Sequence, residues 1–595
     1  MRSSFLEFNI AASGLFASQK ALSVVSNNIS NANTVGYSRQ VVKQQATTPM
    51  ASSNGRGMTG TGTEILDIKQ IRDLYLDAKY WSQNSKLGNS EIKNNMLTKI
   101  QMLFNEPSDN GVNTVINDFF SSLSDVSKDT SDESYYSSVR ESATTLVGFF
   151  NETANSLITY QQELNDEIKI KVNQINSIAS QVKSLNEQIY KFEIDGSTAN
   201  DLRDQRALLI DDLSKIVNVQ VDEIEKNSSL ADGAYSESDE LKSDKHFVVK
   251  INGQVIVDHY NVSQLTVVPR GYKNNPEDTT GLYDIKWSTG LALNTQNLEG
   301  ELKGCLDLRD GNNGSIFTGN TSVVDLMTNQ ITVNNISRSD IQDTGMLKVG
   351  SLYKDYTSYT YNETTKEITF QLSDATGVVV GDGVSMGSGT DYKGVPHYLS
   401  KLNKFARTLA IAFNEGEYSD GTKIDGVTGN TNGYSADGST GNYIFTYNQT
   451  GKGTFANYNN ITAINFSLSK EFGQNPKTLA ISKTLNSGES NNELINEFLT
   501  IKDNTSLFKE GKVLDFVGSI IGEMAVDAKY SGNYENIQTN IINSIINQRT
   551  SVSGVDLNEE MTNMVKFQSA YSAAARMISV IDEIYDTTIN NMGAR

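Results

Sequence analysis

The 595-residue chain is poor in the residues that most often carry chemistry: it contains one cysteine, three histidines and six prolines. The single cysteine, Cys305, excludes an internal disulfide framework and a cysteine-rich metal site. His246, His259 and His397 leave little material for a zinc site or a Ser-His-Asp triad. Because proline disrupts helices and strands, its scarcity favours long, uninterrupted elements.

Basic charge is also in short supply, with 50 Lys and Arg against 71 Asp and Glu and a net charge of −21. This balance argues against nucleic acid and anionic membranes as partners, because both are bound by clustered Lys and Arg. No apolar run approaches the ~18 residues of a membrane-spanning helix. The first ten residues, which include Arg2 and Glu7, show no cleavable secretory signal. The length predicts about four structural units.

Catalytic and metal-binding motifs are missing as well. The sequence has no H-E-x-x-H, G-x-S-x-G, Walker A or C-x-x-C pattern. Asp420, Asp425 and Asp437 lie among glycines, but their spacing fits no known calcium loop, so a solvated loop is the preferred interpretation. We expect Cys305 to be a small core residue and His397 to be structural. The sequence therefore predicts no enzyme activity, no metal and no cofactor.

Residues 5–31, in contrast, have the spacing of a long apolar helix with few charges. Such a helix either packs within one domain or pairs with the other chain end and with other subunits. We prefer the second interpretation, because a helix that is apolar almost all round needs several partners. The predicted assembly residues of this helix are Phe5, Phe8, Leu15, Leu22 and Ile29.

Residues 557–592 mirror this first helix, with apolar residues recurring every seven positions. We expect this C-terminal helix to share the assembly interface. Its predicted assembly residues are Leu557, Met564, Phe567, Tyr571, Ile578, Ile581 and Tyr585.

A third helical region, residues 139–195, alternates three- and four-residue apolar spacings in the manner of a coiled coil. Its predicted seam consists of Leu164, Ile168, Ile175, Ile178, Val182, Leu185 and Ile189. Further helices are expected from residue 65 or 72 to 105, and over residues 112–128, 201–216, 398–415, 493–508 and 513–549.

Composition changes near Val217, where apolar residues begin to alternate with polar ones, as in strands. Turn signals such as Asn252-Gly253 separate the predicted strands. The fold class expected is a multidomain α+β protein, in which both chain ends form a coiled-coil-like helical bundle and β-rich outer domains are inserted in the middle.

The expected units are discontinuous in the sequence. Residues 1–45 with 555–595 form an inner helical domain, and residues 46–220 with 396–416 and 490–554 form a helical rod. Residues 221–395 form the β-rich outer part. Residues 417–489 are a loop-rich or small β region of uncertain assignment.

Several short segments carry a resemblance to a known family. The segment ALSVVSNNISNANTVGYSRQ (21–40) resembles the N-terminal signature of the flagellar rod, hook and hook-associated proteins. The segments DLRDQR (201–206), GELKGCLDLRD (300–310), SGVDLNEE (553–560) and FQSAYSAAAR (567–576) resemble the hook-associated members. The residues of the signature turn are Asn28, Asn31, Asn33, Thr34, Gly36 and Tyr37.

The resemblance implies a secreted structural component of the bacterial flagellum, exported unfolded by the flagellar type III pathway. It would join hook to filament by assembling its terminal helices into a tube. The implied partners are other copies of the chain in a ring or helical array, the hook protein, hook-associated protein 3 and an export chaperone at the C-terminal helix. Two alternatives stay open: another axial protein of hook or rod type, which the DLRDQR segment disfavours, and a surface adhesin with a glycan-binding outer domain.

Overall fold

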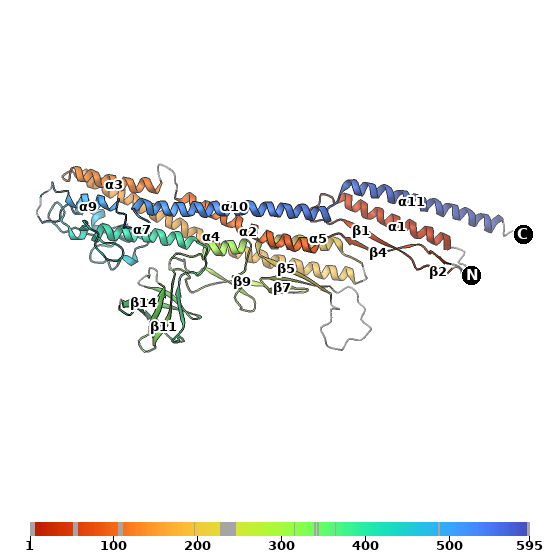
Figure 1. Ribbon diagram of the computed structural model, residues 1–595, viewed down its shortest axis with the longest axis horizontal. Coiled ribbons are helices and arrows are strands. Elements are labelled where there is room, and N and C mark those ends of the chain that lie inside the picture. Colours follow the sequence, from red (N-terminus) through yellow and green to blue (C-terminus); the bar gives the residue numbers. More distant parts are fainter. Residues whose placement is uncertain are drawn as a thin grey trace.

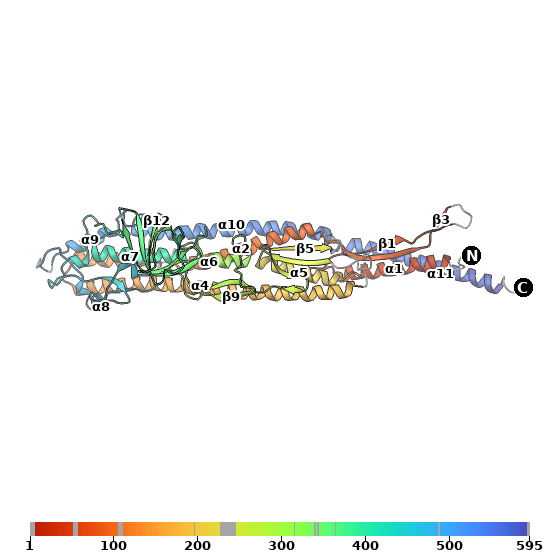
Figure 2. The ribbon, with the colours of Figure 1, turned by 90° about the horizontal axis from the view of Figure 1, so that it is seen from below.

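The computed structural model describes residues 6–51, 57–104, 111–194, 197–225, 245–314, 316–337, 341, 344–362, 364–485, 488 and 490–591. The molecule is a long rod with both chain ends at one tip (Figure 1). A view from below shows the same elongated arrangement (Figure 2). Within the described ranges, no helix combines the length and the apolar character needed to cross a membrane.

The tip that carries both chain ends is the terminal unit. Helices α1 (Leu6–Ser30) and α11 (Leu557–Asp586) lie side by side, and a π-helical turn, η4 (Thr587–Asn591), follows α11. Strand β1 (Gln40–Ala46) pairs antiparallel with β4 (Thr63–Gln70), and the short strands β2 (Met50–Ala51) and β3 (Met58–Thr59) extend this ribbon. Helix α1 lies between α11 and the ribbon (Figure 1).

Of the two helix starts expected after the ribbon, the one at residue 65 is wrong. Residues 63–70 form β4, in which Ile65, Asp67 and Lys69 belong to an alternating segment that suits a strand pairing with β1. Helix α2 (Leu74–Leu103) begins only after Asp73, whose carboxylate caps it by accepting from the Tyr75 N–H at 2.9 Å. The ribbon also crosses the domain boundary expected between residues 45 and 46.

The rod is built from long helices around one apolar core. Helix α4 (Glu133–Glu193) has 61 residues and is roughly 90 Å long at 1.5 Å per residue. Helices α2 and α10 (Val513–Ser553) pack against each other beside it. Shorter helices complete the rod: α3 (Val112–Lys128), α5 (Asn200–Ile216), α6 (Glu301–Arg309), α7 (Val395–Glu415) and α9 (Glu493–Ile501).

The end of the rod far from the chain ends is rich in aromatic side chains. Phe150 of α4 stacks on Phe405 of α7 with ring centroids 4.5 Å apart, and Phe119 meets Phe413 edge to face. The region of residues 417–489 packs into this core. Its elements are η1 (Asn430–Asn432), β17 (Phe445–Tyr447), η2 (Tyr458–Asn460), β18 (Phe466–Leu468), α8 (Lys470–Gln474) and η3 (Pro476–Thr478).

Two β structures lie on one side of the rod. A four-stranded sheet, in the order β5-β6-β7-β8, consists of β5 (Val219–Glu225), β6 (Lys245–Ile251), β7 (Gln254–Asp258) and β8 (Asn261–Val262). A hairpin of β9 (Leu265–Pro269) and β10 (Tyr283–Trp287) follows it. Both contribute residues to the core of the rod.

Besides this sheet and its hairpin, a closed β-barrel projects from the rod (Figure 1). It encloses a core of its own, separate from that of the rod. Its strands, in the order β11-β12-β15-β14-β13-β16, are β11 (Phe317–Asp325), β12 (Gln330–Ser337), β13 (Gly345–Val349), β14 (Leu352–Asn362), β15 (Glu367–Leu372) and β16 (Gly383–Met386). The expected fold class, with joined chain ends and inserted β-rich domains, is confirmed.

Candidate assembly interface

Helix α1 buries one side of its surface within the terminal unit. On α1 the buried apolar residues are small: Ala17, Ala21, Val24 and Val25. Small side chains there allow helix α1 to approach both α11 and the ribbon. The predicted row of larger residues lies beside this buried face, with Phe8 exposed, Leu15, Leu22 and Ile29 half-buried, and Phe5 outside the described residues.

On α11 the predicted row is the covered one. Ile581 is buried, and Leu557 is exposed at the start of the helix. Met564, Phe567, Tyr571, Ile578 and Tyr585 are half-buried. The structure therefore brings the two predicted helices together as one antiparallel pair (Figure 1).

A second apolar surface of α11 has no partner among the described residues. It consists of Met561, Val565, Met577, Val580 and Ile584, and we call it the free α11 face. Val565, for example, is 63% exposed, whereas Ile581 is 5% exposed. Phe16 of α1 is also exposed. Several exposed apolar side chains on one side of a helix are typical of an interaction site.

The signature turn connects α1 to the ribbon through a buried asparagine. The Asn28 amide donates to the Gln40 carbonyl at 2.9 Å and to Glu560 Oε2 at 3.1 Å. Its oxygen accepts from the Gln40 N–H at 3.0 Å and from the Tyr37 hydroxyl at 2.9 Å. Burial, together with nearby carboxylates, raises the pKa of Tyr37, so its hydroxyl remains a donor.

The remaining signature residues shape the turn. The Asn31 amide donates to the Asn27 carbonyl at 3.1 Å, and the Thr34 hydroxyl donates to Asn31 Oδ1 at 3.2 Å. Gly36 adopts a φ of 81°, which favours glycine, and packs against Leu208. Asn33 and Thr34 are exposed.

An ion pair ties the start of α11 to the ribbon. Arg39 contacts Glu559 at 2.6 Å and the nearly fully buried Glu560 at 2.8 Å. Burial alone would lower the pKa of Arg39, but the hydrogen bonds that Arg39 donates to Glu559 and Glu560 outweigh burial and raise that pKa. Arg39 and these carboxylates lie in the YSRQ and SGVDLNEE segments. Neither segment indicates that the two meet, because more than 500 residues separate them.

The DLRDQR segment, at the start of α5, holds the terminal unit to the rod. Asp204 Oδ2 accepts from the Ser38 N–H at 2.8 Å, and Asp201 accepts from the Gln40 amide at 2.8 Å. Burial raises the pKa of Asp204, although the Ser38 N–H and Arg72 act in the opposite direction. This docking role was not predicted from the sequence.

The predicted seam of α4 is buried along its whole length, from Leu164 to Ile189. The elements packed against α4 include the helices α5 and α6 and the strands β7 and β9. The seam residues therefore pack into a core that is formed by both helices and strands, and not against a second coiled-coil helix alone. Phe192, which continues the row, is exposed.

The residues considered for chemistry have local structural roles. Cys305 is fully buried, and burial raises its pKa to about 12, so the thiol is protonated at neutral pH. Asp420 and Asp437 accept hydrogen bonds from Thr422 and Ser439 within their own turns. In the part of the chain that the structure describes, no three His, Cys, Asp or Glu residues are grouped to hold a metal ion.

Known families match the same regions. The model of the flagellar hook-associated protein FlgK helical domain matches residues 97–345. The flagella basal body rod protein model matches residues 8–37, and the model of the C-terminal part of the flagellar basal body rod FlgEFG proteins matches residues 546–592. The last two cover α1 with its turn, and α11.

Flagellar hook-associated protein 1 of Bacillus subtilis (strain 168) is 32% identical over 604 residues, which span 100% of this chain and 99% of the relative. The chain belongs to the flagellar hook-associated protein 1 family. The hook-associated protein 1 of Escherichia coli (strain K12) is 24% identical, over 98% of this chain and 99% of its own. A solved structure, the flagellar hook junction protein FlgK from Burkholderia pseudomallei, is similar at 15% identity with a TM-score of 0.46, covering 81% of this chain and all of that one.

Membership in the hook-associated protein 1 family makes the chain a structural axial component of the extracellular bacterial flagellum, which assembles with other axial proteins. The sequence-based prediction of the family is confirmed.

Proposed function

We propose that this chain is the subunit that joins the hook to the filament, and that α1 and α11 of neighbouring copies pack into the inner helical layer of a tube. The observation that carries this proposal is the free α11 face at the tip of the rod. Within one copy, α11 is covered on the side that meets α1. A neighbouring copy is needed to cover the other side.

The energetics favour such a contact. Fully burying one Val, Ile or Met side chain stabilises a complex by about 1.5–3 kcal/mol. The five residues of the free α11 face are 50–63% exposed, so covering them gains about half of this value for each residue. That gain offsets a large part of the loss of rotational and translational freedom on association. The middle and end of this helix carry five charged residues of both signs, so charge repulsion between copies is small there: Lys566, Arg576, Asp582, Glu583 and Asp586.

The other units take positions outside this layer. The rod formed by residues 46–220, 396–416 and 490–554 would surround the inner layer, and the β-rich residues 221–395 would lie outermost. The ribbon of residues 40–70 would accompany the inner layer, because β1 and β4 both contact α1. Residues 417–489 would belong to the rod, whose core they share.

The partners in this proposal are other copies of the chain, the hook protein on one side and hook-associated protein 3 on the other. Export would proceed unfolded through the flagellar type III pathway. The apolar α11, which is accessible before assembly, is the segment an export chaperone would hold.

The test is one charge placed on the free α11 face. Val565→Asp should abolish attachment of filaments to hooks in cells that lack the native protein, because a carboxylate cannot be buried unpaired between copies. The matched control is Val379→Asp, since Val379 lies in a loop of the barrel and is also 63% exposed. Attachment is counted by electron microscopy, and immunogold labelling locates the protein along the flagellum.

Both purified variants should unfold at the wild-type temperature, because each replaces a side chain that is exposed in the monomer. Normal filament attachment in Val565→Asp would contradict the proposed interface. Label along the hook or rod, rather than at the boundary of hook and filament, would favour another axial position.

A further inference from the structure

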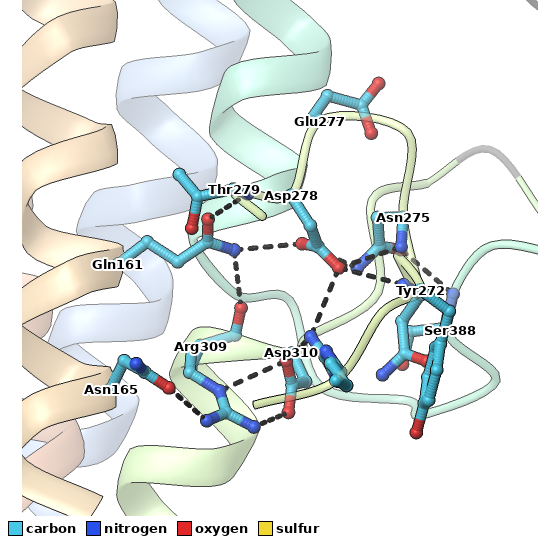
Figure 3. Close-up of polar contacts among 12 residues, drawn as sticks. Gln161, Asn165, Tyr272, Asn275, Glu277, Asp278, Thr279, Arg309, Asp310 and Ser388 are labelled. Carbon is cyan, nitrogen blue, oxygen red and sulfur yellow. Dashed lines mark hydrogen bonds and ion pairs between the residues drawn. The ribbon is translucent and has the colours of Figure 1, made fainter. Parts of the chain in front are cut away.

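The connection between the barrel and the rod is a buried polar cluster (Figure 3). Two segments link the barrel to the rest of the chain: the outgoing segment after Asp310 and the returning segment after Met386. They run side by side, because the Asn312 N–H donates to the Tyr392 carbonyl at 2.7 Å. At Gly311 a Cβ would lie 2.2 Å from the Gly394 nitrogen, so these segments touch with no room for a side chain.

Asn275, in the loop between β9 and β10, is hydrogen-bonded to both segments. Its amide donates to the Gly311 carbonyl at 3.1 Å. Its oxygen accepts from the Ser388 N–H at 2.9 Å (Figure 3). The neighbouring Asn274 carbonyl accepts from the Gly387 N–H at 3.1 Å. Asn275 is fully buried. One loop of the hairpin therefore holds the barrel's entry and its exit.

This loop is in turn anchored to α4 by Asp278. One carboxylate oxygen accepts from the Gln161 amide at 2.9 Å, and the other accepts from the Asn275 N–H at 2.9 Å (Figure 3). Gln161 also donates to the Arg309 carbonyl at 3.0 Å and accepts from the Thr279 N–H. Gln161 and Asp278 are both buried, so these contacts are shielded from water.

Charges of both signs close the cluster at the end of α6. Arg309 pairs with Asp310 and donates to Asn165 Oδ1 of α4 at 2.7 Å. Arg270 of the hairpin contacts Asp310 at 2.6 Å and Asp278 at 3.5 Å. Each arginine of the cluster therefore has a carboxylate partner. Arg309 and Asp310 belong to the GELKGCLDLRD segment, to which the assembly proposal gives no role.

We infer that Asn275 and the cluster of Arg270, Asp278, Arg309 and Asp310 form a rigid joint that holds the barrel at one angle to the rod. Apolar packing tolerates sliding, whereas hydrogen bonds are directional and a buried charge is costly to leave unpaired. The barrel and the rod have separate apolar cores, so the polar contacts set the angle. The stacked rings of Tyr272 and Tyr353, with centroids 3.7 Å apart, are a second contact between hairpin and barrel.

The experiment measures the spread of one distance between rod and barrel in the full chain. Spin labels are attached to Glu152→Cys on α4 and Ser358→Cys on β14, both exposed positions, and pulsed electron paramagnetic resonance gives the distance distribution. The native Cys305 is fully buried and does not take up label. The joint predicts one narrow distribution, which Asn275→Ala broadens at least twofold. Asn173→Ala, an exposed asparagine of α4, is the matched control and should leave the width unchanged.

Asp278→Asn provides a second variant, which is nearly unchanged in shape but loses the charge that faces Arg270 and one acceptor oxygen of the joint. It decides the question if Asn275→Ala fails to fold. Broadening in either variant, with amide exchange in the barrel strands unchanged, supports a joint that orients an intact barrel. A distribution already broad in the parent, or one equally narrow in both variants, overturns the inference.

Discussion

Helices α4 and α11 share a seven-residue apolar spacing, yet the chain covers them to very different extents. Helix α4 buries a residue at nearly every turn, including Leu164, Ile168 and Ile175, against helices and strands of the same chain. Of the 30 residues of α11, all of them described, only Glu560 and Ile581 are buried. The same pattern thus builds a core in the rod and leaves surface for assembly at the tip.

The difference arises from what lies beside each helix. Helix α4 is flanked by the helices α3, α5, α6 and α7 and by the strands β7, β9 and β18, whereas α11 has α1 as its main neighbour. An amphipathic helix gains most of its stability from packing. We therefore expect the rod to be stable as a monomer, and the terminal unit to gain much of its stability in the flagellum.

The largest expected effect is on the stability of the monomer, when a buried apolar residue of α4 and an exposed one of α11 are each replaced by alanine. Ile175→Ala should lower the free energy of unfolding of the monomer by about 2–5 kcal/mol, because Ile175 is fully buried and the substitution leaves a cavity. Val565→Ala should change it by less than about 0.5 kcal/mol, because Val565 is exposed. Urea denaturation of the purified monomer measures both. Equal losses would mean that the free α11 face is covered within the chain.

A smaller effect is expected at the ion pair that docks α11. Arg39→Met leaves the buried Glu560 without its cationic partner and should destabilise the terminal unit by about 1–3 kcal/mol. The measurement is hydrogen exchange of the α11 amides.

The control for this substitution is Arg140→Met, because Arg140 pairs with Glu141 on the exposed surface of α4. Such surface pairs contribute about 0–1 kcal/mol. We expect Arg39→Met to speed exchange of the α11 amides, and Arg140→Met to leave exchange of the α4 amides nearly unchanged. Equal increases in exchange would mean that the terminal unit depends on single polar contacts no more than the rod does.

The smallest expected effect is a pH dependence of stability that arises from His397 in the rod. Burial in α7 lowers the pKa of His397, although its contact with Glu523 at 3.0 Å acts in the opposite direction. Lys393 and Lys401 nearby add to the lowering. Since the unfolded chain binds a proton more readily than the folded one, this group's contribution to stability is complete above about pH 6.5 and is lost as the pH falls below it.

Thermal unfolding at pH 7.5 and 5.5 checks this effect. The melting temperature should fall less on acidification in His397→Gln than in wild type, since all other titrating groups are common to both proteins. An identical fall in the two proteins would show that His397 makes no contribution.

Local periodicity predicted much of the fold. The spacing of Leu164, Ile168 and Ile175 identified α4, and the alternation after Val217 identified the outer strands, because both patterns repeat within a few residues. The strand β4 was assigned to a helix in one of the two alternatives, since Ile65 and Ile68 also fit a helical spacing. What settles its conformation is its pairing with β1, a contact that lies outside the segment itself.

Local sequence patterns did not predict the polar contacts that hold one unit of the molecule to another. Arg39 and Glu560 meet at 2.8 Å although they are 521 residues apart, and Gln161 meets Asp278 across 117 residues. A single sequence contains no signal for such pairs, because each residue on its own resembles an ordinary surface residue. Only their burial shows that they hold one unit to another.

By itself, the sequence determined that this protein is a building block without disulfides, whose two apolar ends form helices, and that it resembles flagellar axial proteins. Composition and short-range spacing suffice for these conclusions, because helix and strand formation are local. The tertiary structure decided which side of each helix is covered, that the outer strands close into a barrel with its own core, and where the units are joined. These properties depend on contacts between distant segments, and only the folded chain brings such segments together.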